Sequence, residues 1–252
     1  MTSAPSASSV AGVAAEPEDR RPPAHHHRDL SGGWLRAAVF GAMDGLVTNV
    51  TLVSGVSGGN ASNHFVVLTG LVGLVGGAFS MAAGEWTSVQ SQNEATRNEL
   101  EMERIELERS PKAEENELVD AWVARGLPEQ LAREVARTVA LDPVQALRVH
   151  AQEELGVDPD KLPSPWQAAG SSFLSFAVGA FIPLAPFLVG GGHALAVAFV
   201  LAALGLFAAG GLVSRFTGRT VVFSGTRQLL FGAVTAALTY GIGAAVGTGV
   251  AG

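Results

Sequence analysis

Residues 65–109 read FVVLTGLVGLVGGAFSMAAGEWTSVQSQNEATRNELEMERIELER, and this one stretch joins two kinds of sequence. Its first part, Phe65–Ala83, carries no charge and has the length of a membrane span, which needs about 20 mostly apolar residues. Its second part is rich in charge, and from Glu85 to Arg109 there is no Gly or Pro to end a helix. The stretch therefore predicts a membrane helix that continues without a break into water.

Four more stretches are apolar enough to cross a bilayer. The predicted fold class is an all-α membrane protein with five transmembrane helices and a cytosolic helical metal-binding insert between spans two and three. The expected spans are Ala37–Ser57, Phe65–Ala83, Trp166–Gly190, Ala194–Ser214 and Leu229–Val250. The expected regions are 1–33, a disordered cytosolic tail; 34–91, spans one and two; 92–164, the insert; and 165–252, spans three to five.

Charge is distributed unevenly along the chain. Only 15% of the 252 residues are charged, and the mean hydropathy is +0.30. Seventeen of the 23 carboxylates lie between Asn93 and Ser164, where the net charge is −8, while the rest of the chain carries +1. An acidic insert argues against a nucleic-acid partner, which requires a basic face. The absence of cysteine excludes disulfides and thiolate metal sites.

Arginines predict the orientation in the membrane. Four precede the first span and three lie between the fourth and fifth, whereas the loops 58–64 and 190–193 contain no Lys or Arg. Since cytosolic loops are enriched in Lys and Arg, we expect the N-terminus and the insert in the cytosol and the C-terminus outside. The Ala/Gly/Arg-rich usage indicates a bacterial source and hence the plasma membrane, with a vacuolar membrane as the alternative.

The insert is predicted to be helical and to contain carboxylates one turn apart. Such pairs can point the same way. They predict either a site for a cation between adjacent helices or a solvated acidic face with interspersed arginines, and spacing alone leaves both open. The expected helices are Gln92–Arg109, Glu114–Arg125, Pro128–Val139 and Asp142–Leu155; the pairs are Glu103 with Glu106 and Glu114 with Glu117, and Glu153 and Glu154 add a third source.

Three residues within or beside the spans are candidates for a transport route. Asp44 lies inside an apolar span, where a carboxylate costs about 2.5–3.5 kcal/mol, and such residues usually serve an ion or proton route. The alternative is a carboxylate paired with Arg36 or a hydroxyl for assembly. Met81 and Glu85 share one helix face, and a thioether beside a carboxylate suits a borderline metal such as Fe(II). The alternative for Met81 is ordinary packing.

Other features narrow the class of protein. No GxxxxGK[ST] loop is present, so we expect an ion gradient rather than ATP to supply energy. No nucleophile–base arrangement indicates an enzyme. Glycines spaced four residues apart, such as Gly41 and Gly45, predict close helix contacts, either within the chain or in a dimer. The run His25–His27 is expected to be part of a solvated tail, with metal binding as the alternative.

Long ordered motifs resemble the vacuolar iron transporter family, which includes the yeast calcium-cross-complementing type. The run Arg36–Asn49, RAAVFGAMDGLVTN, resembles the first span of that family, and Ser80–Gln92, SMAAGEWTSVQSQ, resembles the end of its second span. Glu153–Gly156 and Leu162–Ala169 resemble the exit from its cytosolic domain. The resemblance extends from Arg36 to the C-terminus.

The resemblance implies a homodimer of five-span protomers that exchanges Fe(II), and often Mn(II), for protons and removes metal from the cytosol. It implies no prosthetic group; Zn(II) and Co(II) are further candidate ions. In two departures from plant relatives, His150 and Ala151 replace methionines and Leu71–Gly77 lacks an acidic residue. His150 can still bind iron. The implied metal ligands are Glu103, Glu106, Glu114, Glu117, Glu154 and His150 in the insert, with Asp44, Met81 and Glu85 on the membrane route.

The sequence therefore predicts a proton-coupled exporter of divalent metal. A membrane-anchored metal sensor or buffer is one alternative, although a mere anchor has no need of Asp44. An uncoupled metal channel is another, and a pH gradient would distinguish it from an exchanger.

Overall fold

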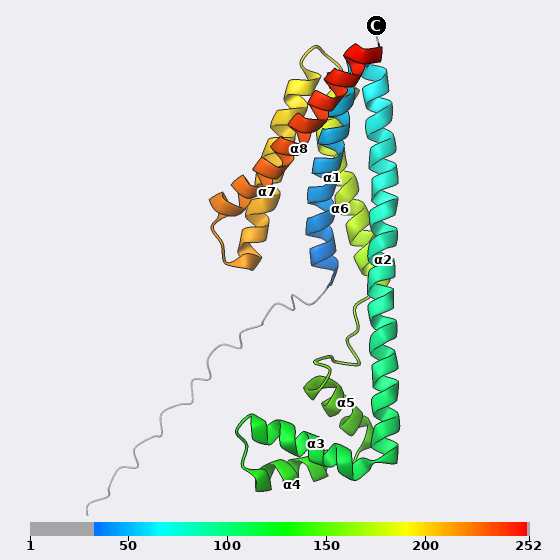
Figure 1. The fold of residues 1–252 in the computed structure, drawn as a ribbon, viewed down its shortest axis with the longest axis vertical. Helices are drawn as coiled ribbons and strands as arrows, with labels where there is room; N and C mark the ends of the chain where they lie inside the picture. The colour runs from blue at the N-terminus through cyan, green and yellow to red at the C-terminus, as the bar shows by residue number, and fades with distance from the viewer. Residues whose placement is uncertain (1–32, 251–252) are drawn as a thin grey trace, which may run out of the picture. The chain divides into compact units, whose positions relative to one another are not determined.

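The structure, a computed structural model, describes residues 33–250. This part of the chain consists of eight α-helices, with no β-strand (Figure 1). The helices are α1 (Gly33–Gly58), α2 (Asn63–Arg109), α3 (Pro111–Ala124), α4 (Glu129–Val139), α5 (Pro143–Glu153), α6 (Pro165–Val189), α7 (Ala194–Thr217) and α8 (Val221–Val250).

Five of these helices are long and apolar enough to cross a membrane: α1, α2, α6, α7 and α8. The all-α class and the five apolar spans are thus confirmed. The fifth predicted span, Leu229–Val250, lies within α8, which begins earlier, at Val221. The predicted helix Glu114–Arg125 likewise begins earlier, at Pro111, since proline is well suited to the first turn of a helix. The predicted tail, with His25–His27, lies outside the described residues except for Gly33.

The apolar helices pack through small residues. α1 contacts α6, α8, α2 and α7 and lies at the centre of the group. At Gly45 of α1, a Cβ atom would collide with the backbone carbonyl of Phe176 in α6; at Gly243 of α8, one would collide with the backbone of Gly55 in α1. The glycines at four-residue spacing therefore allow close helix contacts within this chain. Inside a bilayer no hydrophobic effect drives helices together, so close packing stabilises them instead.

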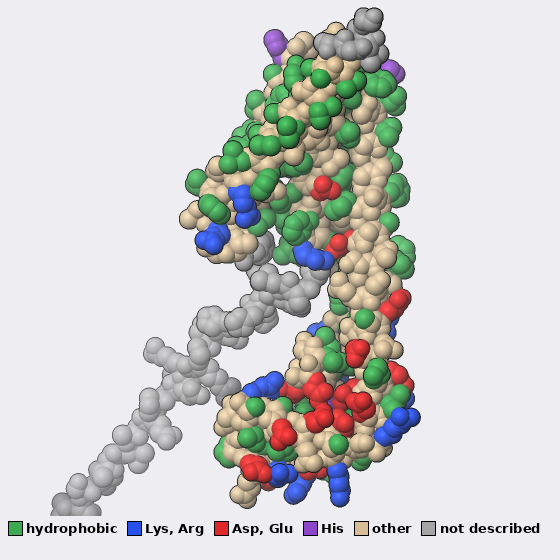
Figure 2. All heavy atoms as spheres, in the orientation of Figure 1, with side chains coloured by type: hydrophobic (Ala, Val, Ile, Leu, Met, Phe, Trp, Pro, Cys, Tyr) green, Lys and Arg blue, Asp and Glu red, His purple; other side chains and the backbone are tan. Residues whose placement is uncertain are grey.

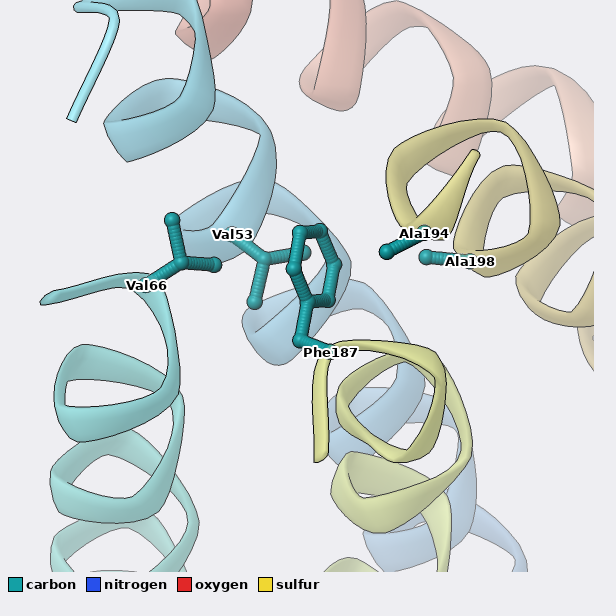
Figure 3. Close-up of a cluster of buried hydrophobic side chains, with 5 residues drawn as sticks. All are labelled: Val53, Val66, Phe187, Ala194 and Ala198. Atoms are coloured by element: carbon teal, nitrogen blue, oxygen red, sulfur yellow. The ribbon is translucent and has the colours of Figure 1, made fainter. Parts of the chain in front are cut away.

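A cluster of buried side chains joins four of the apolar helices (Figure 3). Val53 of α1, Val66 of α2 and Phe187 of α6 meet Ala194 and Ala198 at the start of α7. The Phe187 ring fills the space that the small alanines leave, and it is only 5% exposed. Packing of this kind fixes the relative positions of the helices that carry Asp44 and Glu85.

Helix α2 continues from the apolar group into the charged segment, as its lack of Gly and Pro beyond Glu85 predicts. Its 47 residues span about 70 Å at 1.5 Å per residue, whereas the hydrocarbon core of a bilayer is about 30 Å thick. The charged half of α2 therefore extends well beyond the apolar part. This half packs against α3 and α5. α2 is the continuous helix that connects the two kinds of sequence.

Helices α3 to α5 form a small structure with its own core. Leu118 and Val119 of α3 pack against Ala132 and Ala136 of α4 in a buried cluster. Asp142 caps α5, because its Oδ1 accepts hydrogen bonds from the backbone N–H groups of the second and third helical residues. The last turn of α5 and the residue after it place His150 and Glu154 toward α2. These helices lie between the second and third apolar spans.

Candidate metal centre

Four metal-binding side chains converge between the charged half of α2, α3 and α5. Glu103 comes from α2, Glu114 from the first turn of α3, and His150 and Glu154 from the end of α5. One ligand atom from each of the four lies within 4.8 Å of the others. Figure 2 shows acidic side chains gathered over this part of the molecule. Four of the six predicted insert ligands are therefore brought together.

His150 is at the centre of the group and is only 1% exposed. Its Nδ1 atom lies 2.9 Å from Glu154 Oε1, 3.0 Å from Glu103 Oε1 and 3.8 Å from Glu114 Oε2. Only the Glu154 contact has hydrogen-bond geometry. One ring nitrogen can donate one hydrogen bond, so it cannot satisfy three carboxylates.

Two buried carboxylate oxygens consequently have no hydrogen-bond partner: Glu103 Oε1 and Glu114 Oε2. Both residues are buried, at 7% and 5% exposure. Burial, with the Glu154 charge next in importance, raises the pKa of Glu103 to about 7, and burial together with Glu117 raises the pKa of Glu114. Buried, unpaired carboxylates are costly unless a cation compensates them.

The remaining two predicted insert ligands, Glu106 and Glu117, are exposed and lie outside the group of four. Their negative charges act on the cluster nonetheless: Glu106 contributes to the raised pKa of Glu103, and Glu117 to that of Glu114. They add negative potential where a cation would approach. Glu153, the predicted neighbour of Glu154, instead forms an ion pair with Arg125.

Other carboxylates of the insert are neutralised by arginine. Arg104 binds Glu101 and Glu108 on the surface of α2, and Arg137 lies 3.2 Å from Glu115. The alternative to a cation site, a solvated acidic face with interspersed arginines, therefore describes these residues. It does not describe Glu103 and Glu114, which are buried and have no arginine partner among the described residues.

Three carboxylates and an imidazole make a mixed oxygen and nitrogen ligand set. Imidazole suits Zn, Cu, Fe and Ni, while carboxylate suits harder ions such as Mn. The set fits a divalent transition metal, and the two unsatisfied oxygens are the atoms that would gain most from one. The helices hold all four side chains within reach of a single ion.

Comparison with known proteins identifies the family. The model of the VIT family matches residues 35–244. A vacuolar iron transporter of Acanthamoeba castellanii is 35% identical over 229 residues, covering 86% of this chain and 81% of that protein. Vacuolar iron transporter homolog 1 of Oryza sativa subsp. japonica is 36% identical over 214 residues, covering 83% and 72%. Vacuolar iron transporter 2 of the same species is 28% identical, covering 86% and 89%. The chain belongs to the VIT family.

In this VIT-family chain, the membrane candidates do not form a cluster like that of the insert. Asp44 is exposed on α1, and the Thr48 hydroxyl donates a hydrogen bond of 3.3 Å to its Oδ1. Met81 packs against the buried cluster of Ala78, Phe176 and Ala180, which supports a packing role.

Glu85 has a partner that the sequence did not predict. Arg36 Nη2 at the start of α1 lies 3.1 Å from Glu85 Oε1, and the Glu85 side chain is 19% exposed. The arginine that was considered as a partner for Asp44 is therefore engaged by Glu85, 49 positions away in sequence. Only the fold brings these two residues together.

A buried amide of this VIT-family protein was also not predicted from the sequence. Asn49 of α1 is fully buried and donates a hydrogen bond of 2.5 Å to the carbonyl of Ala180 in α6. A polar residue within an apolar span was a usable signal, because polar groups inside membranes usually bond between helices. The amide fixes α1 against α6 one turn beyond Asp44.

Proposed function

We propose that this protein is a proton-coupled exporter of divalent metal, with Fe(II) as the main substrate and Mn(II) as a second one. The observation that carries the proposal is the convergence of Glu103, Glu114, His150 and Glu154, with two buried carboxylate oxygens left without a hydrogen-bond partner. Relatives named vacuolar iron transporters support Fe(II) as the cargo.

In this proposal the insert faces the cytosol and collects metal there. Glu106 and Glu117 lie at the surface beside the cluster and attract cations toward it. The arginines near the start of α1 and around the α7–α8 turn support the same orientation, since cytosolic loops are enriched in Arg. The membrane is the plasma membrane in a bacterium and the vacuolar membrane in a eukaryote.

The route through the membrane would use Asp44, with Met81 and Glu85 nearby. In a single copy Asp44 is exposed, with the Thr48 hydroxyl as its hydrogen-bond partner. A carboxylate that faces lipid costs about 2.5–3.5 kcal/mol. We therefore propose a homodimer in which a second copy covers this face of α1, so that Asp44 lines a path between the two copies.

Proton coupling follows from the chemistry of a carboxylate ligand. A protonated carboxyl holds a divalent ion more weakly than a carboxylate does. Protonation of Asp44 or Glu85 from the outside would release metal on that side, and loss of the proton to the cytosol would reset the ligand. The proton gradient thereby drives metal export without ATP.

Flux measurements in reconstituted vesicles test the proposal. With metal on the insert side and a proton gradient of opposite direction, wild-type protein is expected to move Fe(II), and Asp44→Ala to abolish the movement. Thr48→Ala is the matched control, because it keeps the carboxylate and removes only its hydrogen-bond donor. Unchanged flux in Asp44→Ala would eliminate the route.

The same assay separates the rival functions. A membrane-anchored sensor or buffer would bind metal through the insert and give no flux in the wild type. An uncoupled channel would give the same flux with and without the pH gradient. An exchanger gives flux that rises with the gradient and moves protons in the opposite direction.

A further inference from the structure

Three arginines gather around the turn between α7 and α8. Arg215 lies in the last turn of α7, Arg219 in the connection and Arg227 in the second turn of α8, and all three are exposed. Residues 165–252 contain no Asp or Glu at all. Within the described part of the chain no carboxylate pairs with these three, although most of the other arginines described there have such a partner.

A groove runs along α8 from this cationic turn toward the apolar group. It has a volume of about 750 Å³. The end nearest the turn contains Thr220, Thr226 and Arg227 together with the apolar Val222 and Phe223, and the other end contains Leu230, Phe231 and Val234. These last three residues are more than half exposed in this chain. One side of α8 therefore offers a largely apolar surface with a guanidinium and two hydroxyls at the end nearest the turn.

We expect the arginines to lie at the level of lipid headgroups, because they flank the start of an apolar span. α8 is one of the apolar spans, and its first turn follows the arginine-containing connection. The guanidinium of Arg219 lies over the Phe223 ring, 5.9 Å from its centroid, so its stem is held near the groove. Guanidinium groups bind phosphate with several N–H donors in a fixed geometry.

We propose that the α7–α8 turn binds the headgroup of an anionic phospholipid, with an acyl chain of that lipid in the groove along α8. Arg219 and Arg227 contact the phosphate, and Leu230, Phe231 and Val234 contact the chain. A second copy of this protein fits less well, because a two-fold interface here would place the same arginines against each other.

The experiment compares purified full-length protein in detergent with added phosphatidylglycerol or phosphatidylcholine, measured by native mass spectrometry and thermal stability. Phosphatidylglycerol is expected to bind more tightly and to raise the unfolding temperature more. Arg219→Gln with Arg227→Gln is expected to weaken its binding by about fivefold for each arginine removed. The matched control is Arg97→Gln with Arg109→Gln, two exposed arginines of the insert, which is expected to change nothing.

A second measurement leaves the arginines intact. Phe223→Trp places a fluorophore in the groove, and the parent protein supplies the background from the natural tryptophans. Brominated phosphatidylglycerol is expected to quench the new fluorophore more than brominated phosphatidylcholine does, and high salt to remove the difference.

Three results would overturn the proposal. Equal binding of the two lipids by the wild type would show that charge plays no part. Equal loss in the insert control would show a non-specific effect of net charge. A change in dimerisation, rather than in lipid binding, on removing Arg219 and Arg227 would make a second copy, or its acidic insert, the occupant of the groove.

Discussion

The carboxylates in the charged half of α2 and those near its apolar half have opposite surroundings. In the charged half, Glu103 points into a buried group with Glu114 and His150, and its Oε1 atom has no hydrogen bond. Where the apolar half ends, Glu85 is paired with Arg36, and on the neighbouring helix Asp44 is exposed. One copy of the chain therefore brings together the ligands of a candidate metal site in the insert, whereas the proposed membrane route would need another surface to enclose it.

Removing the two buried carboxylates should have the largest effect on this contrast. Glu103→Gln with Glu114→Gln removes two ligands and is expected to weaken Co(II) or Mn(II) binding by more than about 100-fold, since even residues that only support ligands matter by 10–100-fold. Glu101→Gln with Glu108→Gln is the matched pair, from the same helix but bound to Arg104. Titration calorimetry measures both; equal losses would contradict a localised site.

A break in α2 should lower metal transport through the membrane while leaving metal binding by the insert intact. Ser91→Pro lies between the two halves, and a proline inside a helix costs about 3 kcal/mol or more. Metal affinity should stay near the wild-type value because the four ligands lie beyond the break, while flux in vesicles should fall strongly. Ser91→Ala is the control. A variant with normal flux would mean that the continuity of α2 is not required.

Proton release on metal binding should reveal the buried carboxylate of Glu103. Burial raises the pKa of Glu103 to about 7, so at pH 6 most molecules carry a proton there and at pH 8 few do. Metal binding requires the ionised form and expels that proton. Release should therefore be larger at pH 6 by up to about one proton per metal, and apparent affinity should fall as pH drops through 7. Calorimetry in buffers of different ionisation enthalpy measures it; a release that does not depend on pH would contradict the assignment.

The smallest effect concerns the Arg36–Glu85 pair. The Arg36 side chain is 58% exposed, so the pair is expected to contribute about 0.2–1 kcal/mol to stability. A double-mutant cycle with Arg36→Gln and Glu85→Gln, followed by thermal unfolding in detergent, measures this coupling. If Glu85 also serves the metal route, its substitution should lower flux more than that of Arg36. Equal flux in both single variants would leave Glu85 with the ion pair alone.

The local sequence predicted the helices better than it predicted which side chains on different helices come into contact. The five apolar spans and the unbroken α2 followed from hydropathy and from the absence of Gly and Pro. α8 begins before the predicted span, because a helix can continue outside lipid past Arg227 and its polar neighbours.

The site needed information that spacing does not contain. Glu103 with Glu106 and Glu114 with Glu117 were indistinguishable as candidates, since each pair is one turn apart. Packing of α2, α3 and α5 turns Glu103 and Glu114 inward and leaves the other two exposed. The Arg36–Glu85 pair was invisible for the same reason: its members lie on different helices.

X-ray absorption of the Co(II)-loaded, full-length protein reports the ligands of the bound ion, so it shows whether metal binds at His150 and the carboxylates around it. We expect one imidazole nitrogen together with carboxylate oxygens, and loss of the imidazole signal in His150→Gln with the oxygen ligands retained. A shell of oxygens alone, unchanged by that substitution, would show that metal binds elsewhere and would refute this site.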